Sequence, residues 1–331
     1  MIPLSVLDLA PVCAGSDASA SLANSRDLAR HAEALGYHRY WLAEHHGMPG
    51  IASAATSVVI ADIAAATSTI RVGSGGVMLP NHAPLLIAEQ FGTLAALHPG
   101  RIDLGLGRAP GTDQRTAQAI RRSLVREEDF VHDVMELQAY FAGTAPVLAT
   151  PGRGLEVPIW ILGSSLYGAQ LAAALGLPYA FASHFAPAAL DEAVAVYRQR
   201  FQPSPAWPKP YLMVAANVIA APTEAEARFL FTSLQQAFVN LRTGQPGLLP
   251  APVERLPFDE ELLRRTGAGS ALSVSAIGDP AQVGEALRAI VARTGADELI
   301  LTAQIHDHAA RRRSFAIAAE AMGLAPLARA A

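Results

Sequence analysis

The stretch Arg101-Ile-Asp-Leu-Gly-Leu-Gly-Arg-Ala-Pro-Gly-Thr-Asp113 joins a short apolar run to two glycines and one arginine. The apolar residues predict a buried strand over Ile102–Leu106. Gly105 and Gly107 leave the backbone open to a bulky neighbour, and the planar guanidinium of Arg108 suits a phosphate group. A strand that ends this way is typical of cofactor sites in α/β proteins. For the arginine alone, an ordinary ion pair with a nearby carboxylate is an equally open interpretation.

Seven other short apolar runs flank this one, and helical segments separate them. The eight predicted strands are Leu4–Leu9, Tyr40–Ala43, Ile70–Met78, Ile102–Leu106, Ile159–Leu162, Tyr179–Ala182, Leu212–Ala220 and Leu299–Ala303. Asp279-Pro280 is typical of a helix start, and Gly176 and Gly295 of helix ends. This alternation favours a (β/α)8 TIM barrel, formed as a single domain over residues 1–331. A doubly wound open sheet is the alternative, although Pro110 stands where a dinucleotide-binding motif needs its third glycine.

Two segments exceed what a minimal barrel requires. Residues 107–127 form a long connection after the fourth predicted strand, and residues 242–278 form another that begins rich in glycine and proline. Connections that follow barrel strands border the active face, and long ones are often functional. We therefore expect both segments to be insertion loops that act as lids, with an ordinary surface excursion as the alternative for the second.

Composition limits the class of protein. Of the 331 residues, 51% are hydrophobic and only 16% are charged, which predicts a large core and excludes extended disorder. The net charge of −4 is spread along the chain, so we expect no nucleic-acid or membrane partner. The single cysteine, Cys13, excludes a disulfide framework and a cysteine-based metal site.

The chain carries no evident targeting or membrane segment. The alanine-rich run 51–70 approaches the length of a membrane span, but Asp62 and several hydroxyl residues interrupt it. Near the N-terminus there is no basic region, and Asp8 interrupts the first apolar run, which argues against a signal peptide. We expect a soluble, cytoplasmic protein.

In a parallel barrel the C-terminal ends of the strands meet at one face, so the residues there should form the site. These ends are Glu44-His45-His46, Gly73-Ser74-Gly75-Gly76, Gly107-Arg108, Gly163-Ser164-Ser165, Ser183-His184 and His306-Asp307-His308. The serines at 164 and 165 directly precede a predicted helix, whose free N–H groups could hold a phosphate opposite Arg108. A serine that only caps the helix is the simpler alternative.

The histidines allow two functional interpretations. Glu44-His45-His46 and His306-Asp307-His308 could together bind a metal, as in barrel hydrolases. Adjacent histidines point in different directions, however, and the first strand has Leu7-Asp8-Leu9 in place of a His-x-His pair, so we expect no metal site. The alternative is a histidine that exchanges protons with a cofactor or substrate. Asp307 is expected to cap the last helix, and no role is assigned to His184, His306 or His308.

Four longer motifs carry a family resemblance. They are Trp41-Leu-Ala-Glu-His-His46, Arg71-Val-Gly-Ser-Gly-Gly-Val-Met-Leu-Pro80, the segment His98–Asp113 and Gly176-Leu-Pro-Tyr-Ala-Phe-Ala-Ser-His184. Their order and spacing resemble the bacterial-luciferase-like flavin-dependent monooxygenases, in particular the single-chain "luciferase family oxidoreductase, group 1" branch. The resemblance extends from the first strand into the last helix.

This resemblance implies FMN bound at the C-terminal face of the barrel. It implies that Arg108 and Ser165 contact the phosphate, that Gly75–Gly76 forms a cis peptide beneath the flavin ring, and that His45 is a catalytic acid or base. The full set of implied cofactor-binding residues is Gly75, Gly76, Gly107, Arg108, Gly163, Ser164, Ser165, Tyr167 and Gly168. Two positions depart from the light-emitting enzyme, which has a reactive cysteine in place of Gly107 and a glutamate in place of Ser164, so light emission is not expected.

The implied activity is a monooxygenase reaction. Reduced FMN, supplied by a separate NAD(P)H:flavin reductase that binds transiently, would react with O2, and one oxygen atom would enter a small organic substrate such as an aldehyde, ketone or sulfur compound. The resemblance also implies a homodimer. Three alternatives stay open: an F420-dependent oxidoreductase of the same superfamily, a noncatalytic flavin-binding protein, and a metal-dependent hydrolase.

Overall fold

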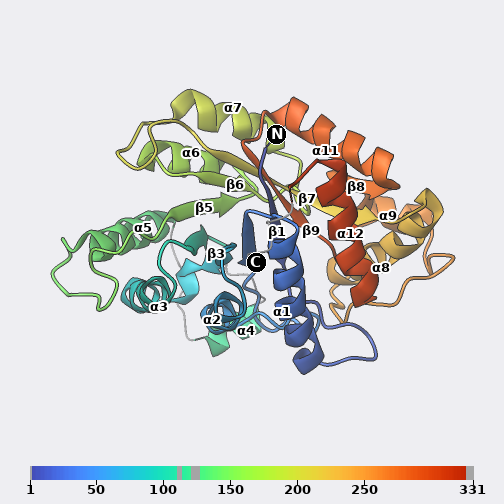
Figure 1. Ribbon diagram of the computed structural model, residues 1–331, viewed down its shortest axis with the longest axis horizontal. Helices are drawn as coiled ribbons and strands as arrows, with labels where there is room; N and C mark the ends of the chain where they lie inside the picture. Colours follow the sequence, from blue (N-terminus) through green and yellow to red (C-terminus); the bar gives the residue numbers. More distant parts are fainter. Residues whose placement is uncertain (1, 110–113, 121–126, 326–331) are drawn as a thin grey trace.

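Parallel strands surrounded by helices form the molecule, as the computed structural model shows for residues 2–109, 114–120 and 127–325 (Figure 1). The strands are β1 (Leu4–Asp8), β2 (Arg39–Leu42), β3 (Arg71–Met78), β4 (Ile102–Gly107), β5 (Ile159–Gly163), β6 (Tyr179–Phe181), β7 (Leu212–Ala220), β8 (Ser275–Gly278) and β9 (Glu298–Thr302). The helices are α1 (Ala18–Ala34), α2 (Thr56–Ala66), the 3-10 turn η1 (Leu79–Asn81), α3 (Pro84–Leu97), α4 (Gln114–Ala119), α5 (Glu127–Ala142), α6 (Leu166–Leu175), α7 (Leu190–Arg200), α8 (Glu224–Arg242), α9 (Glu260–Arg265), α10 (Ala268–Ala271), α11 (Pro280–Thr294) and α12 (His308–Ala321).

Eight of these strands close into a barrel. β1 to β7 pair in sequence order, β7 also pairs with β9, and β9 pairs with β1. This arrangement is the (β/α)8 TIM barrel predicted from the sequence, and each of the eight predicted runs overlaps one of its strands, with ends that agree to within one residue. The ninth strand, β8, was not predicted. It pairs with Asn217–Ala220 of β7, beyond the part of β7 that pairs with β9.

Alternating side chains divide the core into two layers. Tyr40 and Leu42 point outward into the large layer between the barrel and its helices, whereas Trp41 points into the barrel. Inside, the ring of Trp41 packs edge-on against that of Trp160, with their centroids 5.1 Å apart. Because both faces of the strands are covered, β1 and β7 are buried along their whole length, as is usual for parallel sheets.

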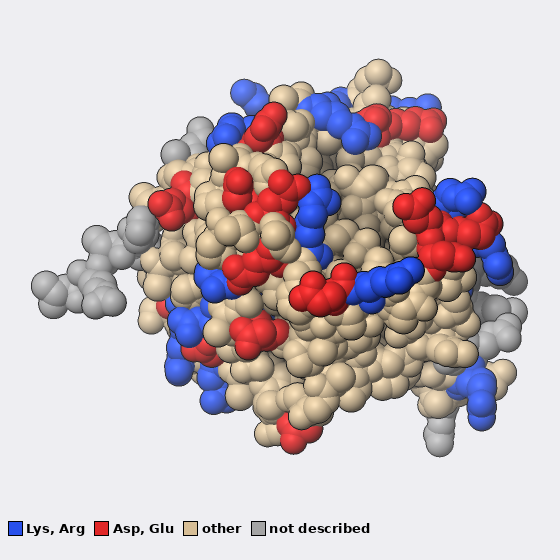
Figure 2. Space-filling model, turned by 90° about the vertical axis from the view of Figure 1, so that its right-hand side faces the viewer, with Lys and Arg blue, Asp and Glu red and all other residues tan. Residues whose placement is uncertain are grey.

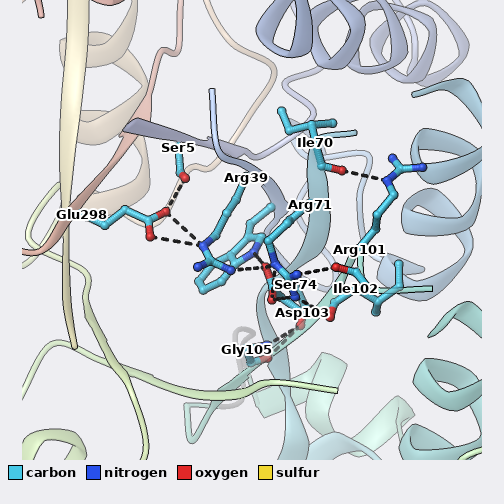
Figure 3. A network of polar contacts seen from close by, with 12 residues as sticks. Ser5, Arg39, Ile70, Arg71, Ser74, Arg101, Ile102, Asp103, Gly105 and Glu298 are labelled. Carbon is cyan, nitrogen blue, oxygen red and sulfur yellow. Dashed lines mark hydrogen bonds and ion pairs between the residues drawn. The ribbon is translucent and has the colours of Figure 1, made fainter. Parts of the chain in front are cut away.

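Ion pairs close the N-terminal end of the barrel (Figure 3). Buried Arg39 bonds Asp103 at 2.7 Å and Glu298 at 3.1 Å, and Arg71 reaches Asp103 at 2.6 Å. The Trp41 indole also donates to Asp103. These residues lie at or next to the first positions of β2, β3, β4 and β9, so the network ties four strands together at one end. The opposite, C-terminal end is therefore the end available to a ligand.

The two long connections contain regular structure of their own. Segment 107–127 includes α4, while its residues 110–113 and 121–126 lie outside the described part of the chain. Segment 242–278 is not a plain loop, because it contains α9, α10 and β8, and Ala268, Ala271 and Leu272 pack against α8 in a small apolar cluster. The interpretation of both segments as lids stays a prediction.

The surface on the side of α8, α9 and α12 carries both signs of charge. Figure 2 shows acidic and basic side chains interspersed there, without a continuous patch of one sign. Within the described residues, no helix has the length and apolar character needed to cross a membrane.

Candidate functional site

Arg108 and the start of α6 form a corner at the C-terminal end of the barrel. Arg108 directly follows β4, and its guanidinium carbon lies 4.1 Å from the centre of the Tyr167 ring. Tyr167 is in the first turn of α6, which follows the next strand, β5. A guanidinium over an aromatic face is attracted by the ring and held near it. The stacking therefore holds the arginine beside the N-terminus of a helix.

The N-terminus of α6 has the features of an anion site. Ser165 is its N-cap residue, but the serine side chain makes no capping hydrogen bond. The Tyr179 hydroxyl donates to the Ser165 carbonyl at 3.2 Å and fixes this turn from the core layer between the barrel and its helices. Arg108 therefore lies near the start of α6, where the first N–H groups have no partner within the helix and the helix dipole favours negative charge.

Gly163 and Gly168 bring this turn close to the end of β5. A Cβ added to Gly163 would lie 3.6 Å from the Cα of Gly168, and one added to Gly168 would lie 3.2 Å from the Tyr179 ring. The first distance is an ordinary contact, whereas the second is tight, so glycine at 168 lets the helix approach Tyr179 without crowding. Ser164 lies between Gly163 and the N-cap, so the sequence-predicted residues of this corner are brought together.

The glycines of β3 are packed by neighbouring strands. The peptide bond between Gly75 and Gly76 is cis, as the resemblance predicted. A Cβ on Gly75 would lie 2.6 Å from Leu7, and one on Gly76 would lie 2.8 Å from the carbonyl oxygen of Gly105. Gly107 on the next strand is less confined, since its added Cβ would meet the Met78 sulfur at 3.1 Å. Gly75 and Gly76 therefore let β3 pack closely against its neighbours at this end of the barrel.

Two histidines lie at strand ends of the barrel. His45 follows β2 and is half-buried, and His184 follows β6 and is buried. Burial of its ring, together with the nearby His45, lowers the pKa of His184 to about 3, so its imidazole is neutral at neutral pH. Asn217 donates to the His184 carbonyl at 2.7 Å, which fixes the backbone there. Among the described residues none hydrogen-bonds Nδ1 of His184, which leaves a buried polar atom for a ligand.

The other sequence-predicted histidines do not join this site. His306 Nε2 bonds the Ala14 carbonyl at 3.0 Å, and His308 Nε2 bonds Asp27 at 2.8 Å. Asp307 accepts from the Ala310 N–H and caps α12, as predicted. The six-residue metal set considered from the sequence is therefore not assembled. Glu44 and His46 instead meet His82, a residue that the sequence analysis missed.

Taken together, the fold and these strand ends define a class: a TIM-barrel protein with an arginine, a helix N-terminus and a half-buried histidine at the C-terminal ends of its strands. Comparison with known proteins identifies the family. The sequence profile of the luciferase-like monooxygenases matches residues 2–298. A protein of Escherichia coli (strain K12) named luciferase-like monooxygenase is 56% identical over 321 residues, which cover 96% of each chain. The chain belongs to the luciferase-like monooxygenase family, which is a family of oxidoreductases.

More distant relatives extend this comparison. The N-acetyl-S-alkylcysteine monooxygenase of Bacillus subtilis (strain 168) is 36% identical over 257 residues, covering 74% of this chain and 75% of its own. The crystal structure of apo-MsnO8 superposes with a TM-score of 0.90 at 36% identity, covering 98% of this chain and 100% of that one. The oxygenating constituent of 3,6-diketocamphane monooxygenase from Pseudomonas putida, in complex with FMN, shares the fold with a TM-score of 0.72 at 17% identity, over 97% of each chain.

Proposed function

We propose that this protein is an FMN-dependent monooxygenase that uses O2 to insert one oxygen atom into a small organic substrate. The observation that carries the proposal is the corner formed by Arg108, Tyr167 and the uncapped start of α6. It offers a fixed guanidinium, a serine hydroxyl and helix N–H groups, which together match a terminal phosphate monoester. FMN ends in such a group.

The rest of the barrel mouth fits the remainder of a flavin. We assign the flavin ring to the ends of β3 and β4, where Gly75, Gly76 and Gly107 have no side chains that could obstruct a flat ring system. The buried Nδ1 of His184 offers a polar contact to the ring or to the substrate. Phosphate contacts are assigned to Arg108 and Ser165, with Gly163, Ser164, Tyr167 and Gly168 forming the turn around them.

When bound in its reduced form, FMN supplies the electrons that activate O2 for transfer of one oxygen atom. The chain's own residues then have separate roles. His45 holds or releases a proton at its imidazole, and His184 stays neutral beside it. The apolar barrel interior, with Leu7 and Trp41 at its wall, keeps water away from the reacting atoms. Closure of segments 107–127 and 242–278 over the mouth would complete this exclusion.

The partners follow from the same proposal. A separate NAD(P)H:flavin reductase would deliver reduced FMN by transient contact, and the enzyme would act as a homodimer in the cytoplasm. Aldehydes, ketones and sulfur compounds are the substrate classes to examine. The Bacillus subtilis relative named for N-acetyl-S-alkylcysteine makes thioethers the first choice among them.

The decisive experiment measures oxygen insertion directly. The full chain is supplied with FMN, an unrelated flavin reductase, NADH and catalase, and substrates are screened under 18O2 with product detection by mass spectrometry. We expect one 18O atom in the product of the true substrate. Binding of F420 in place of FMN, with hydride transfer and no oxygen uptake, would contradict the proposal in favour of a deazaflavin enzyme. Tight FMN binding without any turnover across the screened classes would favour a noncatalytic flavin-binding protein.

A further inference from the structure

A cavity lies next to the end of β2. Its volume is about 460 Å³, and it opens between the start of α2 and the first turns of α3. Glu44, His46 and His82 line one side, and the lining skips His45. Glu44 and His46, which flank the proposed catalytic histidine, thus line a cavity that His45 does not line.

Three potential ligand atoms converge at this cavity. His46 Nε2 lies 2.9 Å from Oε1 of Glu44, and His82 Nε2 lies 2.7 Å from the same oxygen. Glu44 is buried, with 2% of its side chain exposed, whereas the two histidine side chains are 21% and 29% exposed on the cavity side. The two nitrogens and the oxygen all lie within 4.8 Å of one another.

We propose that Glu44, His46 and His82 form a binding site for a divalent first-row transition metal of the Zn2+ type. Two imidazole nitrogens and one carboxylate oxygen are a common ligand set for such ions, whereas Ca2+ and Mg2+ prefer oxygen ligands alone. The fourth position opens into the cavity, which is the arrangement of a site that keeps room for water or a small ligand.

The present geometry needs only a small adjustment. Ligand atoms around tetrahedral zinc lie about 3.3 Å apart when each is about 2.0–2.1 Å from the metal. The observed separations of 2.9 Å and 2.7 Å would widen by roughly 0.5 Å as the metal takes the place of the hydrogens facing Glu44. Both histidines are partly exposed and can make this movement, while the buried carboxylate stays in place.

The site brings together two distant segments. Glu44 and His46 follow β2, and His82 follows η1, after β3. Binding would therefore clamp the two strand ends together and fix the chain on both sides of His45. The metal-site proposal does not depend on which flavin binds, because none of the three metal ligands is among the proposed cofactor contacts.

The test uses the full chain without a polyhistidine tag, freed of metal by dialysis against a chelator. Co2+ is titrated and followed by its visible absorption, and Zn2+ is titrated by calorimetry. We expect one metal per chain, and an affinity at least about tenfold lower in His46→Gln and His82→Gln, because even outer-shell substitutions cost about 10–100-fold. His308→Gln is the matched control, since His308 also bonds a carboxylate through Nε2 but has no third ligand.

Unchanged binding in both glutamine variants, or no binding by the wild-type chain, would overturn the proposal and leave the cluster as a hydrogen-bonded group. Circular dichroism checks that each variant folds. Crystals soaked in Zn2+ give an answer that needs no variant: an anomalous peak between Glu44, His46 and His82 supports the site, and peaks only elsewhere refute it.

Discussion

At the residue scale, the neighbours of Arg108 hold its guanidinium in place and indicate what it could bind. Arg108 follows a strand, stacks on Tyr167 and lies beside the start of a helix whose N-cap side chain is not used for capping. Each feature alone has an ordinary structural explanation, but together they provide three kinds of donor for one anion. Because these donors belong to one corner of the barrel, we propose that the corner binds the phosphate of the cofactor.

The first prediction separates the phosphate from the flavin ring. In Arg108→Ala, FMN should bind roughly 10- to 100-fold more weakly, because a hydrogen bond to a charged group contributes about 1.5–3 kcal/mol. Riboflavin, which lacks the phosphate, should lose much less affinity. Fluorescence titration with both ligands measures the difference. Arg242→Ala is the control, since Arg242 also stacks on an aromatic ring, that of Phe238, but lies on α8. If FMN and riboflavin lost affinity equally in Arg108→Ala, Arg108 would have no specific role in binding the phosphate.

The second prediction concerns proton transfer at His45. In His45→Ala, flavin affinity should stay within about twofold, while product formation falls by about 100-fold or more, the usual contribution of a general acid or base. Titration and single-turnover product analysis measure the two effects separately. His132→Ala is the control, since His132 is an exposed residue of α5. Unchanged turnover in His45→Ala would make this histidine structural.

The sequence predicts the residues that lie at strand ends, but it does not predict contacts between residues that are far apart in the chain. The strand ends follow from the order of apolar runs, so Arg108 and Ser165 could be placed at the same face. His82 could not be assigned, because it lies 36 residues beyond His46 and no local spacing links them. The metal set considered from the sequence therefore contained Glu44 and His46 but lacked His82, the third member of the cluster in the structure.

At the scale of elements, one missed strand shows the limit of apolar patterns. β8 has only four residues, Ser275–Gly278, and two of them are half-buried. Such a run is too short to distinguish from a loop in the sequence. It becomes a strand because it pairs with Asn217–Ala220 of β7. The eight barrel strands were recognisable because their neighbours on both sides bury them, which requires continuous apolar runs.

A buried ion pair joins the first strand to the last helix and gives the third prediction. Asp8 at the end of β1 bonds Arg311 of α12 at 2.5 Å and accepts from the Tyr40 hydroxyl. Burial alone would raise the pKa of Asp8, but Arg311 and the hydrogen bonds outweigh it, so the pKa is lowered. In Asp8→Asn, the free energy of unfolding at pH 7 should fall by about 3–5 kcal/mol, because Arg311 is left buried without its counter-charge.

The lowered pKa sets the pH range of this effect. The contribution of Asp8 is fully present above the pKa of about 3.9 that an unfolded aspartate has, and it is lost as the pH falls through the lower folded pKa. The difference between wild type and Asp8→Asn should therefore shrink in acid. Urea unfolding from pH 7 down to pH 3 measures it. Asp62→Asn, which breaks the exposed pair with Arg26, should cost no more than about 1 kcal/mol. A pH-independent difference would contradict the assignment.

In the barrel as a whole, the residues expected to stabilise the fold and those proposed to bind the ligand lie at opposite ends. Charged residues inside it gather at the N-terminal ends of the strands, where Arg39, Arg71, Asp103 and Glu298 close the interior (Figure 3). The anion corner lies at the other end of the same strand, β4. Asp103 and Arg108 are five residues apart, which is about 16 Å along a strand. Substitutions at the two ends should therefore have different consequences.

Asp103→Asn provides the last prediction. It keeps the size of the side chain but removes the carboxylate that Arg39 and Arg71 share, which leaves Arg39 paired with Glu298 alone and takes from Arg71 the carboxylate it bonds here. We expect a loss of about 3–5 kcal/mol in the free energy of unfolding, the cost of breaking a buried pair. FMN affinity, measured well below the unfolding temperature, should stay within about twofold. Arg108→Ala should show the reverse pattern, with weakened FMN binding and a small change in stability. If Asp103→Asn weakened FMN as much as Arg108→Ala does, the two ends of the barrel would be coupled, and the separation of stability from binding would not hold.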